Sequence, residues 1–462
     1  MQERLEIISP VDGSVYWQGA YADDAAVDAA LVAASQARGA WAATAVEQRI
    51  STIRPFVEAV ERRADQFAQL ISWQMGRPLH LANETEVFVD LANFYLSDAE
   101  RALTDERLPG TDHEQRLLCH EPYGLCLSIC AWNYPMGMAA SEIIAPLVAG
   151  NVVLFKHAPQ VARIGALLQE CAIEASLPHG VFQAIQLTHG QAERVLASGL
   201  VRGLFFIGST RGGFEVRRAA SSQLVYEHLE LGGSDPAYVA EDADIDATAK
   251  HFVSGGFSNA GQSCCSVERV FVADAIADRF IEALAANVAK EVTVDHPIDK
   301  QPMIGPLVSA QAAERVRGLI EDGVRSGARA ILPEPAHLRE LPGTAYVAPQ
   351  ILIDAEPEMS IVREEIFGPV VTVQRVKSDT EAVLRMNASA FGLTSSVWTQ
   401  DLRRGEALCR LLEAGVTYVN RCDYVDELIP WGGRKGSGLG RMDGLSWARS
   451  VTEPKGIYIR RL

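Results

Sequence analysis

Short apolar runs alternate with helix-like segments between residues 124 and 231, and this alternation limits the possible folds more than any other feature of the chain. The apolar runs lie at 125–131, 152–155, 181–187, 204–207 and 225–229. The helix-like segments between them lie at 138–148, 161–175, 191–197 and 211–221. Apolar runs without polar alternation are typical of strands covered on both faces, and their order with the helices predicts a parallel, doubly wound sheet. The first expectation is therefore an α/β fold.

A second α/β unit is predicted beyond Gly233. Its strands are expected at 237–240, 267–272, 370–373, 395–398 and 416–420, and its helices at 242–257, 309–326 and 381–386. The first hundred residues are expected to be helical, at 22–41 and 46–74. The Gly-rich segment 430–441 is expected to be a loop, and the alternating tail 455–462 an edge or intersubunit strand. No repeat or low-complexity linker separates the two units, so they are expected to be tightly joined.

Composition excludes several classes of function. The 42 Lys and Arg residues against 59 Asp and Glu residues give a net charge of −17, which argues against a general nucleic-acid binder. No run of eighteen apolar residues predicts a membrane-spanning helix, and residues 1–6 lack the pattern of a secretory signal, so a cytoplasmic location is expected. The eight cysteines form no CxxC pair and the histidines no HExxH motif, so neither a disulfide scaffold nor a metal site is predicted.

Polar, small or flexible residues follow each predicted strand of the first unit. They are Trp132 and Asn133, Lys156, His189 and Gly190, the segment 208–210, and the segment 230–233. Ligands of doubly wound sheets bind beyond the carboxyl ends of the strands. The binding site is therefore predicted at this one edge of the sheet.

Three residue types near this edge suit covalent acyl chemistry. Cys264 lies in a segment of small and polar residues, 259–265, that would let a ligand approach the thiol. Taken singly, a cysteine is usually a small core residue, Glu230 could be a solvated carboxylate and Asn133 a turn residue. Together they supply a nucleophile, an activator of water and an oxyanion donor.

Six motifs resemble those of the aldehyde dehydrogenase superfamily, in the family's order and over nearly the whole chain. They are AWNYP at 131–135, FIGST at 206–210, ELGG at 230–233, GQSC at 261–264, EEIFGP at 364–369 and GGRKGSG at 432–438. The resemblance implies a Rossmann-like cofactor domain (1–104 and 122–232), an α/β catalytic domain (233–430) and a small β oligomerisation element (105–121 and 440–462). It also implies a homo-oligomer, a dimer or tetramer.

The resemblance implies a role for each catalytic candidate. Cys264 matches the nucleophile, which would form a thiohemiacetal with an aldehyde and then a thioester. Asn133, with the backbone N–H of Cys264, would stabilise the oxyanion, and Glu230 would activate the water that hydrolyses the thioester. A relative that passes the thioester to CoA, or a catalytically silent binding or structural protein, are the alternatives. Glu230 argues against the first, and the presence of all three residues against the second.

The cofactor implied by the resemblance is NAD or NADP. The residues that match its site are Trp132, Lys156, Gly208, Ser209, Leu231, Glu365 and Phe367. Of these, Ser209 matches the ligand of the pyrophosphate and Lys156 that of the adenosine ribose. Glu365 matches the ligand of the nicotinamide ribose, and Phe367 the side chain against the nicotinamide ring. Pro159 stands where the family commonly has the Glu that binds the ribose 2′-hydroxyl of NAD, so NADP is expected to be tolerated or preferred.

The aldehyde itself is left open between two types. The run Lys156–Pro159 is similar to that of some bacterial succinate-semialdehyde dehydrogenases, which favours a small aliphatic aldehyde or a semialdehyde. The predicted entrance loop, 420–427, carries three acids, Asp423 among them, and favours an aminoaldehyde, although Arg421 could bind a carboxylate. By resemblance Tyr134, Met138 and Ser141 line the substrate tunnel, and the small Ser141 suggests a wide one.

Overall fold

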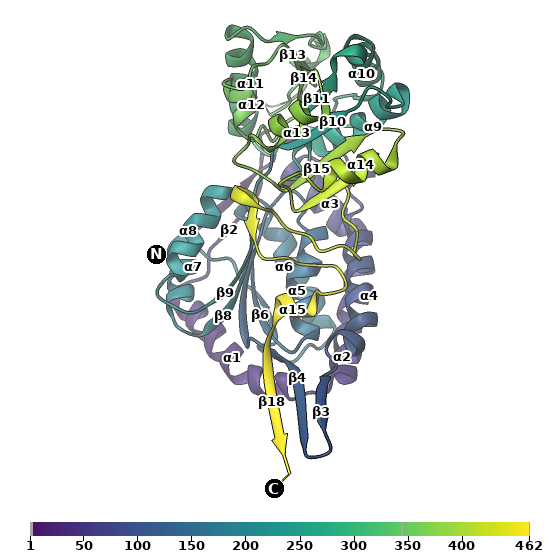
Figure 1. The fold of residues 1–462 in the computed structure, drawn as a ribbon. Coiled ribbons are helices and arrows are strands. Elements are labelled where there is room, and N and C mark those ends of the chain that lie inside the picture. Colours follow the sequence, from purple (N-terminus) through teal and green to yellow (C-terminus); the bar gives the residue numbers. More distant parts are fainter. Residues whose placement is uncertain (1–2, 343–344, 462) are drawn as a thin grey trace.

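The computed structural model describes residues 3–342 and 345–461 of the 462-residue chain. It has two sheet-containing units, stacked one above the other, and an arm that projects from the lower unit and ends at the C-terminus (Figure 1). Each unit has its own hydrophobic core on and around its sheet. In the described part of the chain, no helix combines the length and apolar character needed to cross a bilayer, and no cluster of three or more His, Cys, Asp or Glu side chains could hold a metal ion.

The first unit contains a six-stranded sheet in the order β17-β9-β8-β5-β6-β7. The bounds are β5 Leu125–Cys130, β6 Val152–His157, β7 Phe182–Ala184, β8 Val201–Ile207, β9 Tyr226–Glu230 and β17 Gly438–Leu439. Strands β5 to β9 run parallel to one another, as the apolar runs predict. In the sheet, β6 and β7 lie on one side of β5, and β8 and β9 lie on the other side. The α/β prediction is confirmed, and the polar strand ends share one edge.

Four helices connect these strands: α5 Gly137–Val148, α6 Ala162–Glu174, α7 His189–Ala197 and α8 Thr210–Ala220. Two of them begin at capping side chains. The Thr188 hydroxyl accepts a hydrogen bond from the backbone N–H of Gln191, and the Gln191 side chain accepts one from the backbone N–H of Thr188. Helix α7 therefore starts with a capping box. The Ser209 hydroxyl accepts from Gly212 N at 3.1 Å and starts α8 directly after β8.

The N-terminal region is helical only in part. It contains α1 Asp24–Ala42, α2 Val46–Glu61, α3 Ala64–Met75, α4 Glu84–Ala102 and the short 3-10 helix η1 Leu79–Leu81. The single helix expected over 46–74 is wrong, because α2 ends and the chain turns at Arg62 and Arg63. Both arginines pair with Glu174 on α6, which fixes the turn there.

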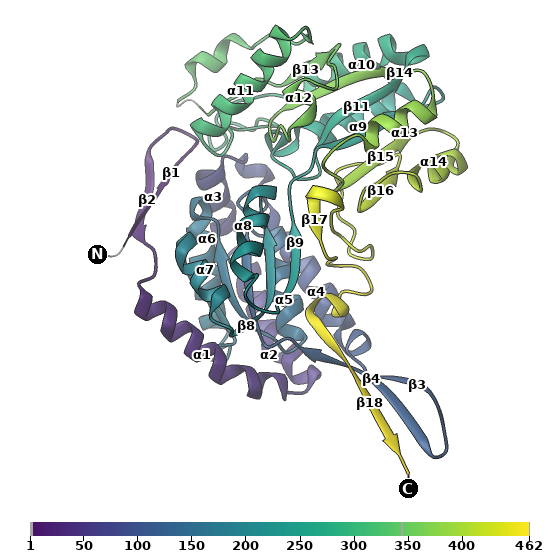
Figure 2. The same cartoon turned by 60° about the vertical axis from the view of Figure 1, so that its left-hand side comes forward.

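A β-hairpin precedes these helices and corrects the expectation of an all-helical N-terminal region. Strands β1 Arg4–Ile8 and β2 Val15–Ala20 pair antiparallel. The turn of this hairpin lies where the two units meet, since Tyr346 donates a hydrogen bond to Val11 O at 2.9 Å (Figure 2). The strands are mostly exposed, so they lack the continuous apolar pattern that marks the buried strands.

The second unit has a seven-stranded sheet in the order β12-β13-β14-β11-β10-β15-β16. The strands are β10 Asp235–Val239, β11 Val267–Ala273, β12 Arg329–Ala330, β13 Gln350–Ile353, β14 Val370–Val376, β15 Thr394–Trp398 and β16 Val416–Val419. Its helices are α9 Ile245–Phe257, α10 Ala277–Glu291, α11 Ala310–Arg325, α12 Ser360–Arg363, α13 Asp379–Asn387 and α14 Leu402–Cys409. Besides η1, the described chain contains short 3-10 helices in both units: η2 Pro159–Val161, η3 Ser258–Gly261, η4 Asp274–Ile276, η5 Ala336–Glu340 and η6 Lys435–Ser437. All strands but β12 are parallel to their neighbours, as predicted for an α/β unit.

The arm is a three-stranded antiparallel sheet in the order β18-β4-β3. Its strands are β3 Glu106–Thr111, β4 Glu114–Pro122 and β18 Thr452–Arg460, and the one-turn helix α15 Ala448–Val451 precedes the last of them. The arm brings together segments more than 300 residues apart, and its tip extends away from both units (Figure 2).

The Gly-rich segment expected as a loop contains strand β17, which corrects that expectation. Gly438 pairs with Glu230 and Leu439 with Leu229, so β17 extends the first sheet beyond β9. A Cβ at Gly438 would lie 2.3 Å from Leu229 O, and Gly438 has φ +154°. Glycine is therefore needed for this close pairing. The requirement comes from a strand that is distant in the sequence and not from the neighbouring residues.

Candidate functional site

Asn133, directly after β5, is held by its backbone carbonyl oxygen. Arg77 Nη2 donates to that oxygen at 2.7 Å and Asn259 Nδ2 at 3.1 Å. The side-chain amide of Asn133 donates to Gln262 O at 3.2 Å, two residues before Cys264. The structure thus brings the predicted oxyanion donor to the segment that carries the predicted nucleophile.

A buried ion pair holds the backbone around Asn133. Arg77 and Glu84 are both nearly inaccessible and pair directly with each other. Glu84 Oε2 also accepts from the backbone N–H groups of Met136 and Gly137, at 2.8 and 3.1 Å, at the start of α5. A buried charge of this kind is retained only when its partners satisfy it, so the pair fixes the loop between β5 and α5.

The segment 258–266, here named the Cys264 loop, has a backbone that favours close approach. Asn259 and Ala260 adopt left-handed φ values of 53° and 57°. Gly261 has φ +70°, and a Cβ there would lie 2.0 Å from Gly368 O, so the loop packs directly against the segment 364–369. These contacts hold the Cys264 loop between the two units.

The two neighbouring thiols have different surroundings. Cys264 is half-buried and Cys265 is buried. Cys265 Sγ donates to Asp423 Oδ1 at 3.2 Å, beside Ser263 Oγ, which donates to the same oxygen at 3.1 Å. The hydrogen bond to Cys264, together with burial, raises the pKa of the Cys265 thiol well above its usual value. Cys264 is therefore the more accessible thiol of the pair.

Glu230 ends β9 and is almost fully buried. Burial, and then the nearby Asp443 carboxylate, raise its pKa well above the usual range. His228 Nε2 lies 3.1 Å from Glu230 Oε1, and burial lowers the pKa of His228 to about 3, so this imidazole is neutral at pH 7. Glu230 can therefore hold a proton near neutral pH, which is what a group that both takes and releases a proton requires.

A buried polar cluster lies next to Glu230. Ser141 accepts a hydrogen bond from Tyr95 at 2.9 Å and donates to Asp443 Oδ1 at 2.7 Å. Ser141 was expected to line a wide substrate tunnel, and the structure places its hydroxyl in this cluster, at 7% exposure. Its neighbour Glu142 is also buried, and burial raises the pKa of its carboxyl to about 8.

Replacing Glu142 by glutamine is expected to make the protein more stable in alkali and to leave its stability near pH 5 unchanged. A carboxyl whose folded-state pKa is raised from 4.5 to about 8 loses stability as pH rises through that interval, because the buried group must ionise. At pH 9 the gain is on the order of 4 kcal/mol. Thermal midpoints at pH 5 and 9 measure it, with the exposed Glu58→Gln as control. Equal effects of Glu142→Gln at both pH values would contradict the assignment.

Five of the predicted cofactor residues lie at or just beyond the carboxyl ends of strands of the first sheet: Trp132, Lys156, Gly208, Ser209 and Leu231. Lys156 is 4% exposed, its ammonium donates to His157 O at 3.3 Å, and burial lowers its pKa to about 8. Ser209 caps α8, whose first N–H groups favour an anion. A Cβ at Gly208 or Gly212 would meet the Phe206 ring, so glycine at both positions lets that ring pack against the start of α8.

Glu365 and Phe367 belong to the segment 364–369, here named the Glu365 loop. Glu365 Oε1 accepts from Gly233 N at 2.9 Å, and burial raises the pKa of its carboxyl to about 7. The Phe367 ring lies 5.5 Å from the Trp132 ring, nearly perpendicular to it. Leu231 packs on the α8 helix start, where a Cβ at Gly213 would meet it. The Glu365 loop thus contacts the segment after β9 through Gly233 and the segment after β5 through Trp132.

The predicted entrance residues Arg421 and Asp423 both contact other side chains. The Arg421 guanidinium stacks 3.3 Å from the centroid of the Tyr424 ring. Asp423 is the acceptor for Ser263 and Cys265, and burial raises its pKa to about 6. Tyr134, on the other side, lies under the Arg77 guanidinium at 4.5 Å. Met138 donates from its backbone to Tyr134 O at 3.3 Å, at the start of α5.

Comparison with known proteins shows which family the chain resembles. The sequence matches the aldehyde dehydrogenase family over residues 1–457. The chain belongs to the aldehyde dehydrogenase family. It is 33% identical over 437 residues to the NADP-dependent succinate-semialdehyde dehydrogenase of Deinococcus radiodurans, covering 94% of this chain and 90% of that one. It is equally identical, over 459 residues, to a betaine aldehyde dehydrogenase of Cereibacter sphaeroides, covering 98% of this chain and 93% of that one.

The fold of this aldehyde dehydrogenase is shared with a solved structure. The NADP-dependent glyceraldehyde-3-phosphate dehydrogenase of Bacillus halodurans, complexed with NADP, superposes with a TM-score of 0.93 at 30% identity, over 99% of this chain and 96% of that chain. The protein is thus an NAD(P)-dependent oxidoreductase, as the six motifs predict.

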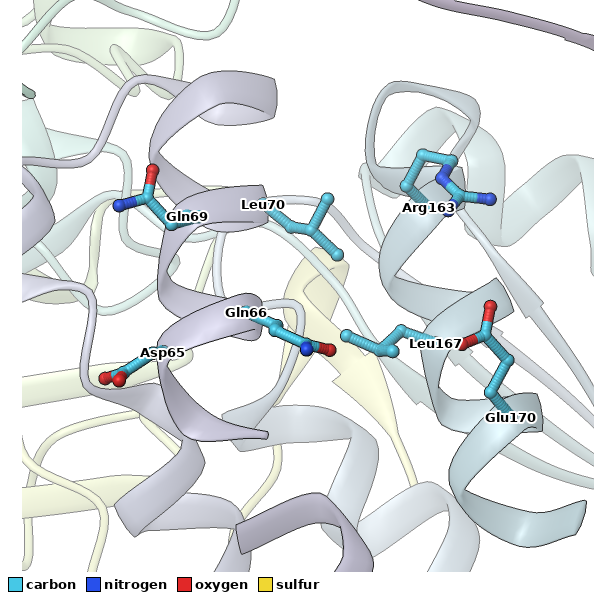
Figure 3. A pocket seen from close by; sticks show the side chains of 7 residues that line it. All are labelled: Asp65, Gln66, Gln69, Leu70, Arg163, Leu167 and Glu170. Carbon is cyan, nitrogen blue, oxygen red and sulfur yellow. The ribbon is translucent and has the colours of Figure 1, made fainter. Parts of the chain in front are cut away.

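A pocket between α3 and α6 lies apart from the dehydrogenase site. Its lining residues are Asp65, Gln66, Gln69, Leu70, Arg163, Leu167 and Glu170 (Figure 3). No residue of this set is among the predicted site residues, and Leu70 and Leu167 are its only apolar members. This pocket therefore contributes none of the residues predicted for the dehydrogenase chemistry.

The sequence analysis missed several buried polar residues of this aldehyde dehydrogenase. Arg77, Glu84, Glu142, His228 and Glu268 are all nearly inaccessible and all contact the predicted site or its supports. A usable signal exists for two of them. Glu142 is the one charge within the otherwise apolar α5, and Glu268 with its neighbour Arg269 interrupts the otherwise apolar β11; charges there are costly unless the fold uses them.

Proposed function

We propose that the protein oxidises a small aliphatic aldehyde or semialdehyde to the carboxylic acid with NAD(P)+ and water. The observation that supports this proposal is that the segments carrying Asn133 and Glu230 both contact the Cys264 loop, whose half-buried thiol is Cys264. Asn133 reaches the Cys264 loop through Gln262 O, and a Cβ on Gly233, three residues after Glu230, would lie 2.4 Å from Cys264 O.

In this mechanism the Cys264 thiolate attacks the aldehyde carbon and forms a thiohemiacetal. The carbonyl oxygen gains negative charge in that step, and the Asn133 amide and the Cys264 N–H stabilise it. Each donor of this kind contributes roughly 3–4 kcal/mol to the transition state. Because Asn133 is fixed through its own carbonyl oxygen by Arg77 and Asn259, its amide needs little reorganisation when the charge develops.

NAD(P)+, when bound, accepts a hydride. Its adenosine and phosphates would be held by Lys156, Ser209 and the α8 start, and its ribose and ring by Glu365 and Phe367. Cys264 is then left as a thioester. Glu230, whose pKa is raised by burial, would in its ionised form take a proton from water, and the resulting hydroxide would hydrolyse the thioester.

An aminoaldehyde is the second candidate substrate, favoured by one observation. Asp423 bonds Ser263 and Cys265 on either side of Cys264, so a carboxyl group lies next to the nucleophile rather than only at the entrance. That group would attract a cationic aldehyde. The betaine aldehyde dehydrogenase relative supports this candidate, and the succinate-semialdehyde dehydrogenase relative supports the first.

An aldehyde panel tests the proposal. Succinate semialdehyde, acetaldehyde, propionaldehyde, betaine aldehyde and 4-aminobutanal are each supplied with NAD+ or NADP+, and NAD(P)H and acid are measured. The same reactions with CoA would reveal acyl-CoA. Acid formation without CoA supports the hydrolytic enzyme, acyl-CoA formation indicates the acylating relative, and no oxidation of any aldehyde contradicts the proposal.

Pro159→Glu is expected to lower kcat/KM for NADP+ by tenfold or more, about 1.4 kcal/mol, and to leave or raise that for NAD+. The proposal behind it is that Pro159, at the start of η2, leaves room for a 2′-phosphate. A new carboxylate would repel the phosphate and accept the NAD 2′-hydroxyl instead. Steady-state kinetics with both cofactors measure the ratio, and Pro159→Gln separates charge from shape. A wild-type enzyme with a strong preference for NAD+ would contradict this proposal.

The arm is proposed to build a homodimer or homotetramer. Ile457, Tyr458 and Ile459 of β18 are exposed large side chains, and β18 has a free edge in the described sheet order. The double variant Ile457→Asp, Ile459→Asp is expected to shift the protein to monomer, measured by light scattering. Ile173→Asp, on the exposed side of α6, serves as the control. A monomeric wild-type protein would contradict the proposal.

A further inference from the structure

Glu268 is a buried carboxyl that the proposed mechanism does not use. It lies on β11, four residues after Cys264, and is 2% exposed. Its side chain points to the Glu365 loop, where Oε1 accepts from Ile366 N at 2.8 Å and from Phe367 N at 2.9 Å. One oxygen thus ties the strand that follows the nucleophile to two backbone groups of another loop.

The Glu365 loop needs such support because its backbone is strained. Phe367 has φ +52°, in the left-handed region that a side-chain-bearing residue rarely adopts. The other side of the loop is held by Arg315, which donates to Ile366 O at 2.9 Å and to Glu365 O at 2.6 Å. Glu268 therefore holds the N–H groups and Arg315 the carbonyl groups of the same short segment.

The loop held in this way carries Glu365 and Phe367, which the proposed function assigns to the nicotinamide half of the cofactor. Glu365 in turn accepts from Gly233 N, whose residue packs on Cys264 O. The contacts run from the nucleophile's strand through Glu268 to the Glu365 loop and back to Cys264.

We propose that Glu268 is a positioning residue that sets the distance between the cofactor's nicotinamide end and Cys264, and so controls hydride transfer without acting on the attack of the Cys264 thiolate or on hydrolysis of the thioester. This inference rests on the proposed function. Burial, and then the Glu365 carboxylate, raise the pKa of Glu268 to about 8, so a neutral side chain occupies the site near pH 7. Glutamine is therefore the conservative replacement, since it keeps a carbonyl oxygen for both N–H donors.

The test compares Glu268→Ala and Glu268→Gln with wild type at pH 7 in three measurements. These are the Kd of NADP+ and NAD+ by fluorescence titration, aldehyde oxidation with 1-deuterated and ordinary aldehyde, and hydrolysis of p-nitrophenyl acetate, which needs Cys264 but no hydride transfer. Thr372→Val is the matched control, because it removes the bond from Thr372 Oγ1 to Glu268 O and leaves the carboxyl in place.

For Glu268→Ala we expect a Kd about tenfold higher, oxidation slower by roughly 10–100-fold with a larger deuterium isotope effect, and ester hydrolysis within about twofold of wild type. Glu268→Gln and Thr372→Val should stay within about threefold of wild type throughout. Parallel loss of ester hydrolysis and oxidation, or unchanged Kd and isotope effect in Glu268→Ala, would overturn the inference. If wild type oxidises no aldehyde, the proposed function fails, and the Kd comparison, which needs no turnover, still decides the role of Glu268.

Discussion

Replacing Cys264 by alanine is expected to lower aldehyde oxidation by at least about 10⁴-fold. Without the thiol no covalent intermediate forms, and the hydride would have to leave an aldehyde hydrate held only by binding contacts. Cys264 is half-buried and alanine is a small truncation of its side chain, so the fold and cofactor binding should be unchanged. Initial rates of NAD(P)H formation, with the Kd of the cofactor measured in parallel, give the result.

The neighbouring thiol provides the matched control for that variant. Cys265→Ala removes a buried group that donates to Asp423, and it should retain most of the activity. Similar losses in the two variants would mean that the loop tolerates no truncation, and the nucleophile would then have to be identified by trapping. Full activity in Cys264→Ala would remove covalent catalysis from the proposed mechanism.

Glu230→Gln is expected to slow steady-state oxidation by roughly 10²–10⁴-fold while preserving the first turnover. The glutamine cannot take a proton from water, so the thioester on Cys264 should accumulate after one equivalent of NAD(P)H has formed. Rapid mixing would show a burst of about one NAD(P)H per active site, followed by a slow phase. Mass spectrometry of the quenched protein would show the acyl group on Cys264.

The pH dependence of the wild-type enzyme gives an independent check on Glu230. Its raised pKa means that the carboxyl is protonated at low pH and becomes an active base only as pH rises. The deacylation rate should therefore increase with pH in the wild type and be flat in Glu230→Gln. The control is Glu227→Gln on the same strand, whose carboxyl pairs with Arg217 away from Cys264. In Glu230→Gln, a first turnover as slow as the later ones would contradict the role assigned to Glu230.

The sequence predicted the elements whose signal is local. Apolar runs identified β5, β6, β8 and β9 because both faces of these strands are covered, so burial alone produces the pattern. The exposed β1–β2 hairpin has no such pattern, and β17 is two residues whose strand character depends entirely on Leu229 and Glu230 across the sheet.

The candidate site was predictable to a similar degree. Asn133, Glu230 and Cys264 follow strands or lie in motifs, and the structure brings their segments together. Arg77 was not predictable, since its bond to Asn259 spans 182 residues and nothing in its neighbourhood distinguishes it from an exposed arginine. The engagement of Ser141 with Tyr95 and Asp443 was equally hidden, because it depends on a residue 302 positions away.

The β17–β9 pairing has a consequence for the order of folding. Glu230 is synthesised near the middle of the chain, but Gly438, its partner across the sheet, emerges only after the whole second unit has been made. Leu231 N also waits for Ser437 O, at 3.0 Å. The first sheet therefore has an open edge at Glu230 during translation, and such an edge can pair wrongly with another chain. Complete closure of that edge is therefore a late, long-range step.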